Sequence, residues 1–216
     1  MKMIVLFGPQ GSGNHLFGKI FSLHDEVHGW KDALKPDGYF IPHYQEPFNH
    51  YWNNINDIDM DIMGGKPYAV TSISNPYIEN FLPKIPPLNE FIEKVESLGI
   101  DVQPVVIGRD RNILTHQQTR LRGGPTWGNM PQLIQWMKIP PFFVSQELLY
   151  LYRRQYVRSL SHWLDFPLAW EDPQIDEILK DDANEKYIHA ADPWWLDDHV
   201  KSILTPPWIH TDDGKA

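Results

Sequence analysis

The spacing of apolar residues changes from one period to another within the first 25 positions of the chain. The run Met3–Phe7 is continuously apolar, which predicts a short strand buried on both faces. From Gly13 to about Leu23 the apolar residues recur three and four positions apart, which predicts an amphipathic helix. Its apolar stripe consists of Leu16, Phe17, Ile20 and Phe21. A glycine-rich turn separates the two patterns, so we expect a strand, a loop and a helix in that order.

The remainder of the chain repeats this alternation. Further strands are predicted over Tyr68–Ile73, Val102–Ile107 and Phe142–Val144. Further helices are predicted over Leu88–Leu98, Asn112–Leu121 and Leu148–Leu164. Residues 24–66 and the segment around Pro83, Pro86 and Pro87 are expected to be irregular. Strands that alternate with helices predict an α/β fold with a mostly parallel central sheet, helices on both faces, and a binding site at the carboxyl ends of the strands.

Length and composition fit one globular domain. The 216 residues, 42% of them hydrophobic, suffice for a single domain over 1–216, in which the acidic residues 170–216 form a C-terminal extension packed on the rest. The absence of cysteine excludes disulfides and thiolate metal sites. No run approaches the roughly 18 apolar residues of a membrane span, and the first residues lack the features of a secretory signal, so a cytoplasmic location is expected. The net charge of −9 argues against nucleic-acid binding.

The turn after the first strand has the glycine spacing of a phosphate-binding loop. Gly8 and Gly13 are separated by four residues, as in the P-loop, but Asn14 and His15 stand where ATP-binding loops have Lys and Ser or Thr. Backbone N–H groups at the start of the following helix can still hold an anion. Ser12, Asn14 and His15 offer additional side-chain donors.

A second candidate anion site follows the strand Val102–Ile107. All seven arginines lie between Arg109 and Arg158, and four of them lie within residues 109–122. Arg109 comes directly after the strand and precedes a predicted helix with a polar face. That face comprises Arg109, Asn112, His116 and Arg120. A guanidinium followed by amide and imidazole groups on one helix face can bind a phosphate dianion.

These two segments together resemble the P-loop sulfotransferases, which use 3′-phosphoadenosine 5′-phosphosulfate (PAPS) as the sulfuryl donor. Gly11–Leu16 is similar to the family's 5′-phosphosulfate loop, with Gly11 at the position of a basic residue. Val105–Asp110 is similar to its 3′-phosphate element, a strand that ends in Arg-Asp and leads into a helix with a serine one to two turns on. Thr115 or His116 stands near that serine position here. Phe143–Leu149 and Trp163–Pro167 are similar to later elements of the family.

The resemblance implies a P-loop NTPase-like fold and sulfuryl transfer from PAPS to a hydroxyl group on a sugar, lipid or other small molecule, without a metal. The implied cofactor-binding residues are Gly11, Ser12, Gly13, Asn14, His15 and Arg109, with Thr115 or His116. Either Arg111 or a histidine could replace the basic residue missing at Gly11.

The acceptor hydroxyl needs a base. The sequence Glu26-Val27-His28 is similar to a Glu-Val-His sequence that carries the base in glycan-modifying members of the family, so Glu26 is the first candidate and His43 the second. Two other functions stay open: a sulfotransferase-like binding protein without catalysis, motivated by Gly11, and a nucleotide kinase, which would need a lysine and a magnesium-binding carboxylate.

Overall fold

Five parallel strands form the central sheet. The computed structural model describes residues 1–30, 48–79, 82–122 and 124–180. The sheet consists of β1 (Lys2–Pro9), β2 (Val27–His28), β3 (Tyr68–Asn75), β6 (Asp101–Gly108) and β7 (Phe142–Ser145). The strands lie in the order β2-β3-β1-β6-β7, and every neighbouring pair is parallel. The predictions of an α/β class and of a parallel sheet are therefore confirmed.

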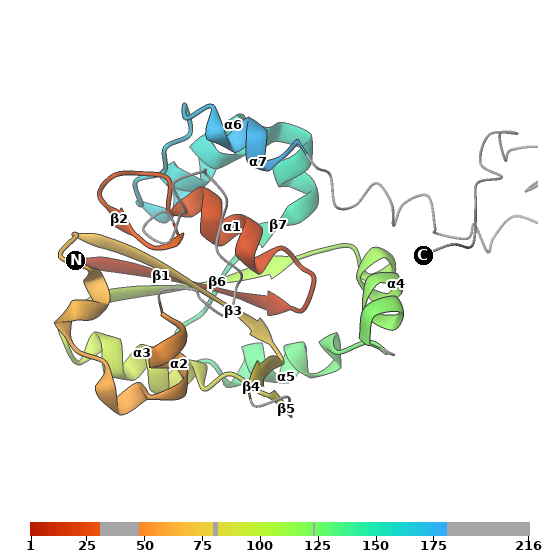
Figure 1. Ribbon diagram of the computed structural model, residues 1–216, viewed down its shortest axis with the longest axis horizontal. Helices are drawn as coiled ribbons and strands as arrows, with labels where there is room; N and C mark the ends of the chain where they lie inside the picture. The colour runs from red at the N-terminus through yellow and green to blue at the C-terminus, as the bar shows by residue number, and fades with distance from the viewer. Residues whose placement is uncertain (31–47, 80–81, 123, 181–216) are drawn as a thin grey trace, which may run out of the picture. The chain divides into compact units, whose positions relative to one another are not determined.

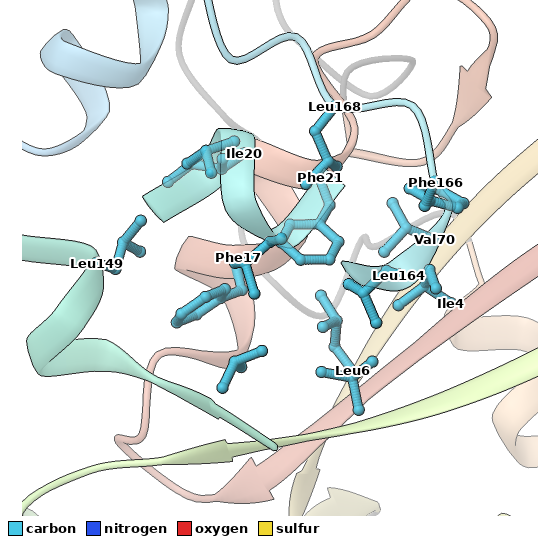
Figure 2. Packing of buried hydrophobic residues seen from close by; sticks show 14 of the residues in the cluster. Ile4, Leu6, Phe17, Ile20, Phe21, Val70, Leu149, Leu164, Phe166 and Leu168 are labelled. Atoms are coloured by element: carbon cyan, nitrogen blue, oxygen red, sulfur yellow. The ribbon is translucent and has the colours of Figure 1, made fainter. Parts of the chain in front are cut away.

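β1 lies at the centre of the sheet and contributes to both hydrophobic cores. Its residues Met3–Phe7 are fully buried, which explains why the run is apolar without alternation. Ile4 and Leu6 face one cluster, whereas Met3, Val5 and Phe7 face the other. Figure 2 shows Phe17 and Phe21 packed with Leu6 in the first cluster.

Helices cover both faces of the sheet, as predicted (Figure 1). The helices on the Ile4 and Leu6 side are α1 (Asn14–Phe21), α6 (Gln146–Leu164) and α7 (Gln174–Ile178). Those on the opposite side are α2 (Asn49–Asn53), α3 (Leu88–Glu96) and α5 (Met130–Trp136), with the 3₁₀ turns η3 (Ile55–Asp57) and η4 (Met60–Met63). α4 (Arg111–Arg122) follows β6 directly and lies beyond the carboxyl end of that strand (Figure 1). η5 (Trp127–Asn129) precedes α5.

Several short elements differ from the sequence-based expectation. The segment around Pro83, expected to be a loop, contains an antiparallel pair of strands, β4 (Tyr77–Glu79) and β5 (Leu82–Lys84). Residues 24–66, expected to be irregular, contain β2 and α2 together with η3 and η4. α5 was not predicted: its apolar residues Met130, Leu133 and Ile134 are spaced as in a helix, but the helix makes only about two turns. These elements are too short for a sequence period to mark them.

α6 begins two residues earlier than predicted and is interrupted. The hydroxyl of Ser145 accepts a hydrogen bond from the backbone N–H of Leu148 (3.2 Å) and so caps the helix. Arg153, in the middle of the helix, has φ 44° and ψ −123°, which is non-helical. Only glycine adopts such a conformation without strain, and Arg153 is exposed, so neither burial nor a core contact compensates for the strain.

Replacing Arg153 by glycine is therefore expected to stabilise the protein, although glycine usually destabilises a helix. We expect Arg153→Gly to raise the free energy of unfolding by about 1 kcal/mol, because it removes the strain at this φ. Gln155, exposed in a regular part of α6, is the matched control. Gln155→Gly should lower the free energy of unfolding by about 1 kcal/mol. Urea unfolding measures both, and a loss of stability in both variants would contradict the strain at Arg153.

All described residues belong to one compact unit, Met1–Asp182. Within the segment 170–216, expected to be a packed extension, the structure describes residues up to 180. Ile175 and Leu179 are buried in the same hydrophobic cluster as α1 and α6. Residues 181–216 lie outside the described part, so the rest of that expectation stays a prediction. In the described ranges, no helix has both the length and the apolar character needed to cross a membrane.

Candidate functional site

The loop between β1 and α1 depends on two glycines in left-handed conformations. Gly11 has φ +88° and Gly13 has φ +101°, values that side chains with a Cβ rarely adopt. The backbone N–H of Ser12 donates to the carbonyl of Pro9 (3.0 Å), which closes the turn. The N–H of Phe17 donates to the carbonyl of Gly13 (2.9 Å), so α1 begins immediately after the loop. The N–H groups of the first turn of α1 thus lie next to the glycines, as an anion-binding loop requires.

Asn14 fastens this loop from the inside. Its side chain is 3% exposed, and its amide nitrogen donates to the carbonyl of Gly8 (3.1 Å) and to the hydroxyl of Ser74 (3.1 Å). Its amide oxygen accepts a hydrogen bond from the hydroxyl of Ser12 (3.2 Å), which is fully buried. These bonds tie the loop to the end of β3. Asn14 therefore replaces the lysine of an ATP-binding loop with a structural amide that does not point toward solvent.

Arg109 and the middle of α4 contact the same loop. Nη1 of Arg109 donates hydrogen bonds to the carbonyl of Gly11 and to Oε1 of Gln117. The amide nitrogen of Gln118 donates to the carbonyl of Gln10 (2.6 Å). Gln118 is completely buried, and its amide oxygen accepts from the backbone N–H of Thr126 (2.6 Å). The structure thus brings together the two segments that the sequence marked separately as anion sites.

The first residue of α6 contacts the loop at Gly13. Gln146 is 3% exposed, and its amide carbon and nitrogen lie 3.4 Å from the position that a Cβ on Gly13 would take. The buried Oε1 of Gln146 accepts no hydrogen bond from any described residue. Buried side-chain oxygens in folded proteins nearly always have a partner. An unsatisfied amide oxygen at this glycine is therefore consistent with a site for a ligand that carries a hydrogen-bond donor.

Asp110 and Glu147 connect α4 to α6 beside the loop. A carboxylate oxygen of Asp110 accepts from the backbone N–H groups of Asn112 (2.9 Å) and Ile113 (3.0 Å), which caps α4. A carboxylate oxygen of Glu147 accepts from the N–H of Asp110 (2.7 Å), and the other from the hydroxyl of Ser145 (2.8 Å). Both carboxylates therefore have structural partners that fix the ends of the two helices.

The side chains of the remaining predicted cofactor residues contact residues outside the glycine loop or are exposed. The ring of His15 packs against Trp30, with 5.3 Å between ring centroids. The hydroxyl of Thr115 accepts from the indole N–H of Trp127 (3.3 Å), and His116 is exposed. Gln117, and not Thr115 or His116, is the residue of α4 that contacts both Arg109 and the loop.

Sequence reasoning missed Gln117, Gln118 and Gln146. A signal existed only for Gln117, which follows Arg109 by eight residues and so lies about two helical turns on.

The structure does not bring Glu26 to the loop. Glu26 is exposed and directly precedes β2, whose Val27 pairs with Tyr68 at the amino end of β3. The loop follows Pro9, which pairs with Asn75 at the carboxyl end of β3. Seven residues of strand separate these two ends, roughly 20 Å. The second candidate base, His43, lies outside the described residues.

In the described ranges, Arg109 contributes positive charge at the loop, next to the neutral amides of Gln117 and Gln146. The guanidinium of Arg111 lies over the ring of Trp127, 4.3 Å from its centroid. Lys19 belongs to the last turn of α1, and burial lowers the pKa of its ammonium group. Within the described ranges, no three His, Asp or Glu side chains cluster in a way that could hold a metal ion. Backbone N–H groups, Arg109 and amide side chains together suit a phosphate or sulfate group.

Comparison with protein-family models finds no family that matches the chain, and comparison with curated proteins finds no matching relative.

Proposed function

We propose that the protein is a PAPS-dependent sulfotransferase with a P-loop NTPase-like fold. The contact of Arg109 with the carbonyl of Gly11 carries this proposal, because it joins a metal-free glycine loop to a strand-end arginine at one place. Both features belong to the resemblance described above. The loop follows the central strand of a parallel sheet at its carboxyl end, where open α/β sheets bind their ligands.

The residues around the loop fit the phosphosulfate end of the cofactor. N–H groups of the loop and of the first turn of α1 would hold the anionic oxygens, with Arg109 and the amides of Gln117 and Gln146 beside them. When bound, PAPS supplies an activated sulfuryl group. In the overall reaction the acceptor oxygen forms a bond to sulfur, the bond between sulfur and the phosphate oxygen breaks, and the hydroxyl proton passes to a base. The chain's part is to position the donor and to stabilise charge on the phosphate.

The arrangement favours sulfuryl transfer over a kinase. Asn14, at the lysine position of ATP-binding loops, donates hydrogen bonds from its amide nitrogen to the carbonyl of Gly8 and the hydroxyl of Ser74. A kinase requires a cation at that position and a carboxylate for magnesium. The carboxylate of Asp110 caps α4, and that of Glu147 accepts from the backbone N–H of Asp110 and from the hydroxyl of Ser145, so both already have structural roles.

A binding protein without catalysis is the second candidate. The observation that favours it is the position of Glu26, at the opposite end of the strands from the loop. Such a protein would bind the cofactor but transfer nothing. Incubation with PAPS and a panel of sugar, lipid and phenolic hydroxyl acceptors separates the two functions: a sulfated product supports the enzyme, and tight cofactor binding without product supports the binding protein.

Isothermal titration calorimetry with 3′-phosphoadenosine 5′-phosphate (PAP) tests the nucleotide specificity. We expect PAP to bind at least tenfold more tightly than 5′-AMP, since a second phosphate adds charge-assisted hydrogen bonds. The affinity should be the same in EDTA and in magnesium. Absence of PAP binding at millimolar concentration, equal affinity for 5′-AMP, or a requirement for magnesium would each contradict the proposal.

A further inference from the structure

The glycine loop lacks a basic residue of its own, yet a guanidinium lies against it. Gly11 and Asn14 occupy the two positions at which phosphate-binding loops of this length carry a cation. Nη1 of Arg109, from the end of β6, donates to the carbonyl of Gly11. The side chain of Gln117 occupies the space next to Gly11, where a Cβ would lie 2.6 Å from its amide oxygen. A side chain at position 11 would therefore displace the group that holds Arg109.

Two other cationic residues in the described ranges, Lys19 and Arg111, are placed differently from Arg109. Lys19 is five residues along α1 from Asn14, about 7 Å farther down the helix axis. The guanidinium of Arg111 stacks on Trp127. Arg109 is half-buried; Gln117 accepts a hydrogen bond from it, and Gln118 ties α4 to the carbonyl of Gln10. Its charge is therefore held close to the loop.

We infer that Arg109 supplies the positive charge for the phosphate bound at the loop, in place of the basic residue missing at Gly11. This inference rests on the proposed function and changes the role of the arginine within it, since the resemblance implies that a strand-end arginine binds the 3′-phosphate. A guanidinium has five N–H donors, so it can hold the carbonyl of Gly11 and the oxygens of an anion together. The 3′-phosphate is then left to the exposed face of α4, which includes Asn112 and His116.

Gln146 independently indicates a ligand at this loop. Gln146 is 3% exposed, its side chain lies against Gly13, and its Oε1 has no hydrogen-bond partner among the described residues. An amide can turn its nitrogen or its oxygen toward a ligand, because the two orientations have nearly the same shape. A nucleotide phosphate with an adjacent hydroxyl offers partners for both atoms. The loop thus has Arg109 at Gly11 and an unsatisfied amide at Gly13.

Three ligands separate the two possible roles of Arg109. Calorimetry would compare the wild type with Arg109→Gln for 5′-AMP, 3′-AMP and PAP. If Arg109 serves the loop phosphate, Arg109→Gln weakens 5′-AMP and PAP by the same factor, about 10- to 100-fold for a lost charge-assisted hydrogen bond, and leaves 3′-AMP unchanged. Arg109→Lys keeps the charge and should retain part of the affinity for 5′-AMP.

The opposite pattern overturns the inference. If Arg109 binds the 3′-phosphate, Arg109→Gln leaves 5′-AMP unchanged, weakens 3′-AMP and reduces the affinity for PAP to that for 5′-AMP. Arg111→Gln removes the same charge two residues away and should change none of the three affinities; an equal loss there would also overturn the inference. Thermal unfolding followed by circular dichroism verifies that the variants are folded.

The same titrations distinguish this inference from the proposed function. If the wild type binds 5′-AMP but shows no preference for PAP, the proposed function is wrong, and the effect of Arg109→Gln on 5′-AMP still decides the role of the arginine. If the wild type binds neither 5′-AMP nor PAP, both are wrong.

Discussion

Asn14→Ala is expected to lower the free energy of unfolding by about 3 kcal/mol and to abolish PAP binding. The substitution leaves the carbonyl of Gly8 and the hydroxyls of Ser12 and Ser74 without the amide that joins them. Each buried polar group that loses its partner costs about 1–3 kcal/mol. The loop also loses its attachment to the end of β3, so its N–H groups are no longer held in position for an anion. Urea unfolding and calorimetry measure the two effects.

An exposed asparagine provides the control for this variant. Asn53, on α2, is exposed and donates to the backbone carbonyl of Asn49 in its own helix. Asn53→Ala should change the free energy of unfolding by less than about 0.5 kcal/mol and leave PAP binding intact. If Asn14→Ala were as stable as Asn53→Ala, the hydrogen bonds of the Asn14 amide would not stabilise the loop. If Asn14→Ala bound PAP with wild-type affinity, PAP binding would not depend on those hydrogen bonds.

The larger elements of the fold were predictable because burial requires apolar residues at positions that the sequence shows. β1, β3 and β6 lie inside a sheet covered on both faces, so each is a run of mostly buried residues. The run Met3–Phe7 of β1 is entirely apolar, whereas in β3 the buried Thr71 and Ser72 accept hydrogen bonds from the indole groups of Trp52 and Trp30. β2 was not predictable, since two residues carry no period and their pairing with β3 is a tertiary contact. The β4–β5 pair was missed for a related reason: the residues of β5 are all exposed, and its central residue is a proline, which usually marks a loop.

The candidate site was predictable in its backbone and less so in its side chains. Gly11 and Gly13 have a conformational reason to be glycine, and Arg109 has a place at the end of a strand, so sequence reasoning found them. Gln146 carries no such signal and Gln117 only its spacing from Arg109, because an amide at a surface position and an amide at a site look the same in sequence.

The position of Glu26 shows what a local sequence pattern does not report. A short Glu-Val-His sequence suggested a base, but the residue after Glu26 pairs at the amino end of β3, and this edge of the sheet is determined by pairing that no local pattern reports. Where a strand pairs therefore decides which end of the sheet its neighbours reach, and hence which residues can take part in the site.

Gly8→Ala is expected to have the largest effect of the substitutions considered, a loss of more than about 3 kcal/mol in the free energy of unfolding. A Cβ at this position would lie 2.8 Å from the carbonyl oxygen of Ile107 and 2.5 Å from the hydroxyl of Ser12. Ile107 is a buried residue of β6, the neighbouring strand, so its carbonyl cannot move without separating two strands of the sheet. The buried Ser12 would also have to leave its bond to Asn14.

A substitution at a glycine without close neighbours tests whether the loss of stability in Gly8→Ala comes from the close approach of β1 and β6. Gly128 has no atom within 4 Å of its would-be Cβ, and its φ is not in the left-handed region. Gly128→Ala should be neutral or slightly stabilising, because alanine restricts the unfolded chain more than glycine does. Urea unfolding of both variants gives the comparison. Equal stability of Gly8→Ala and Gly128→Ala would show that β1 and β6 do not approach as closely at the start of the loop as the anion site requires.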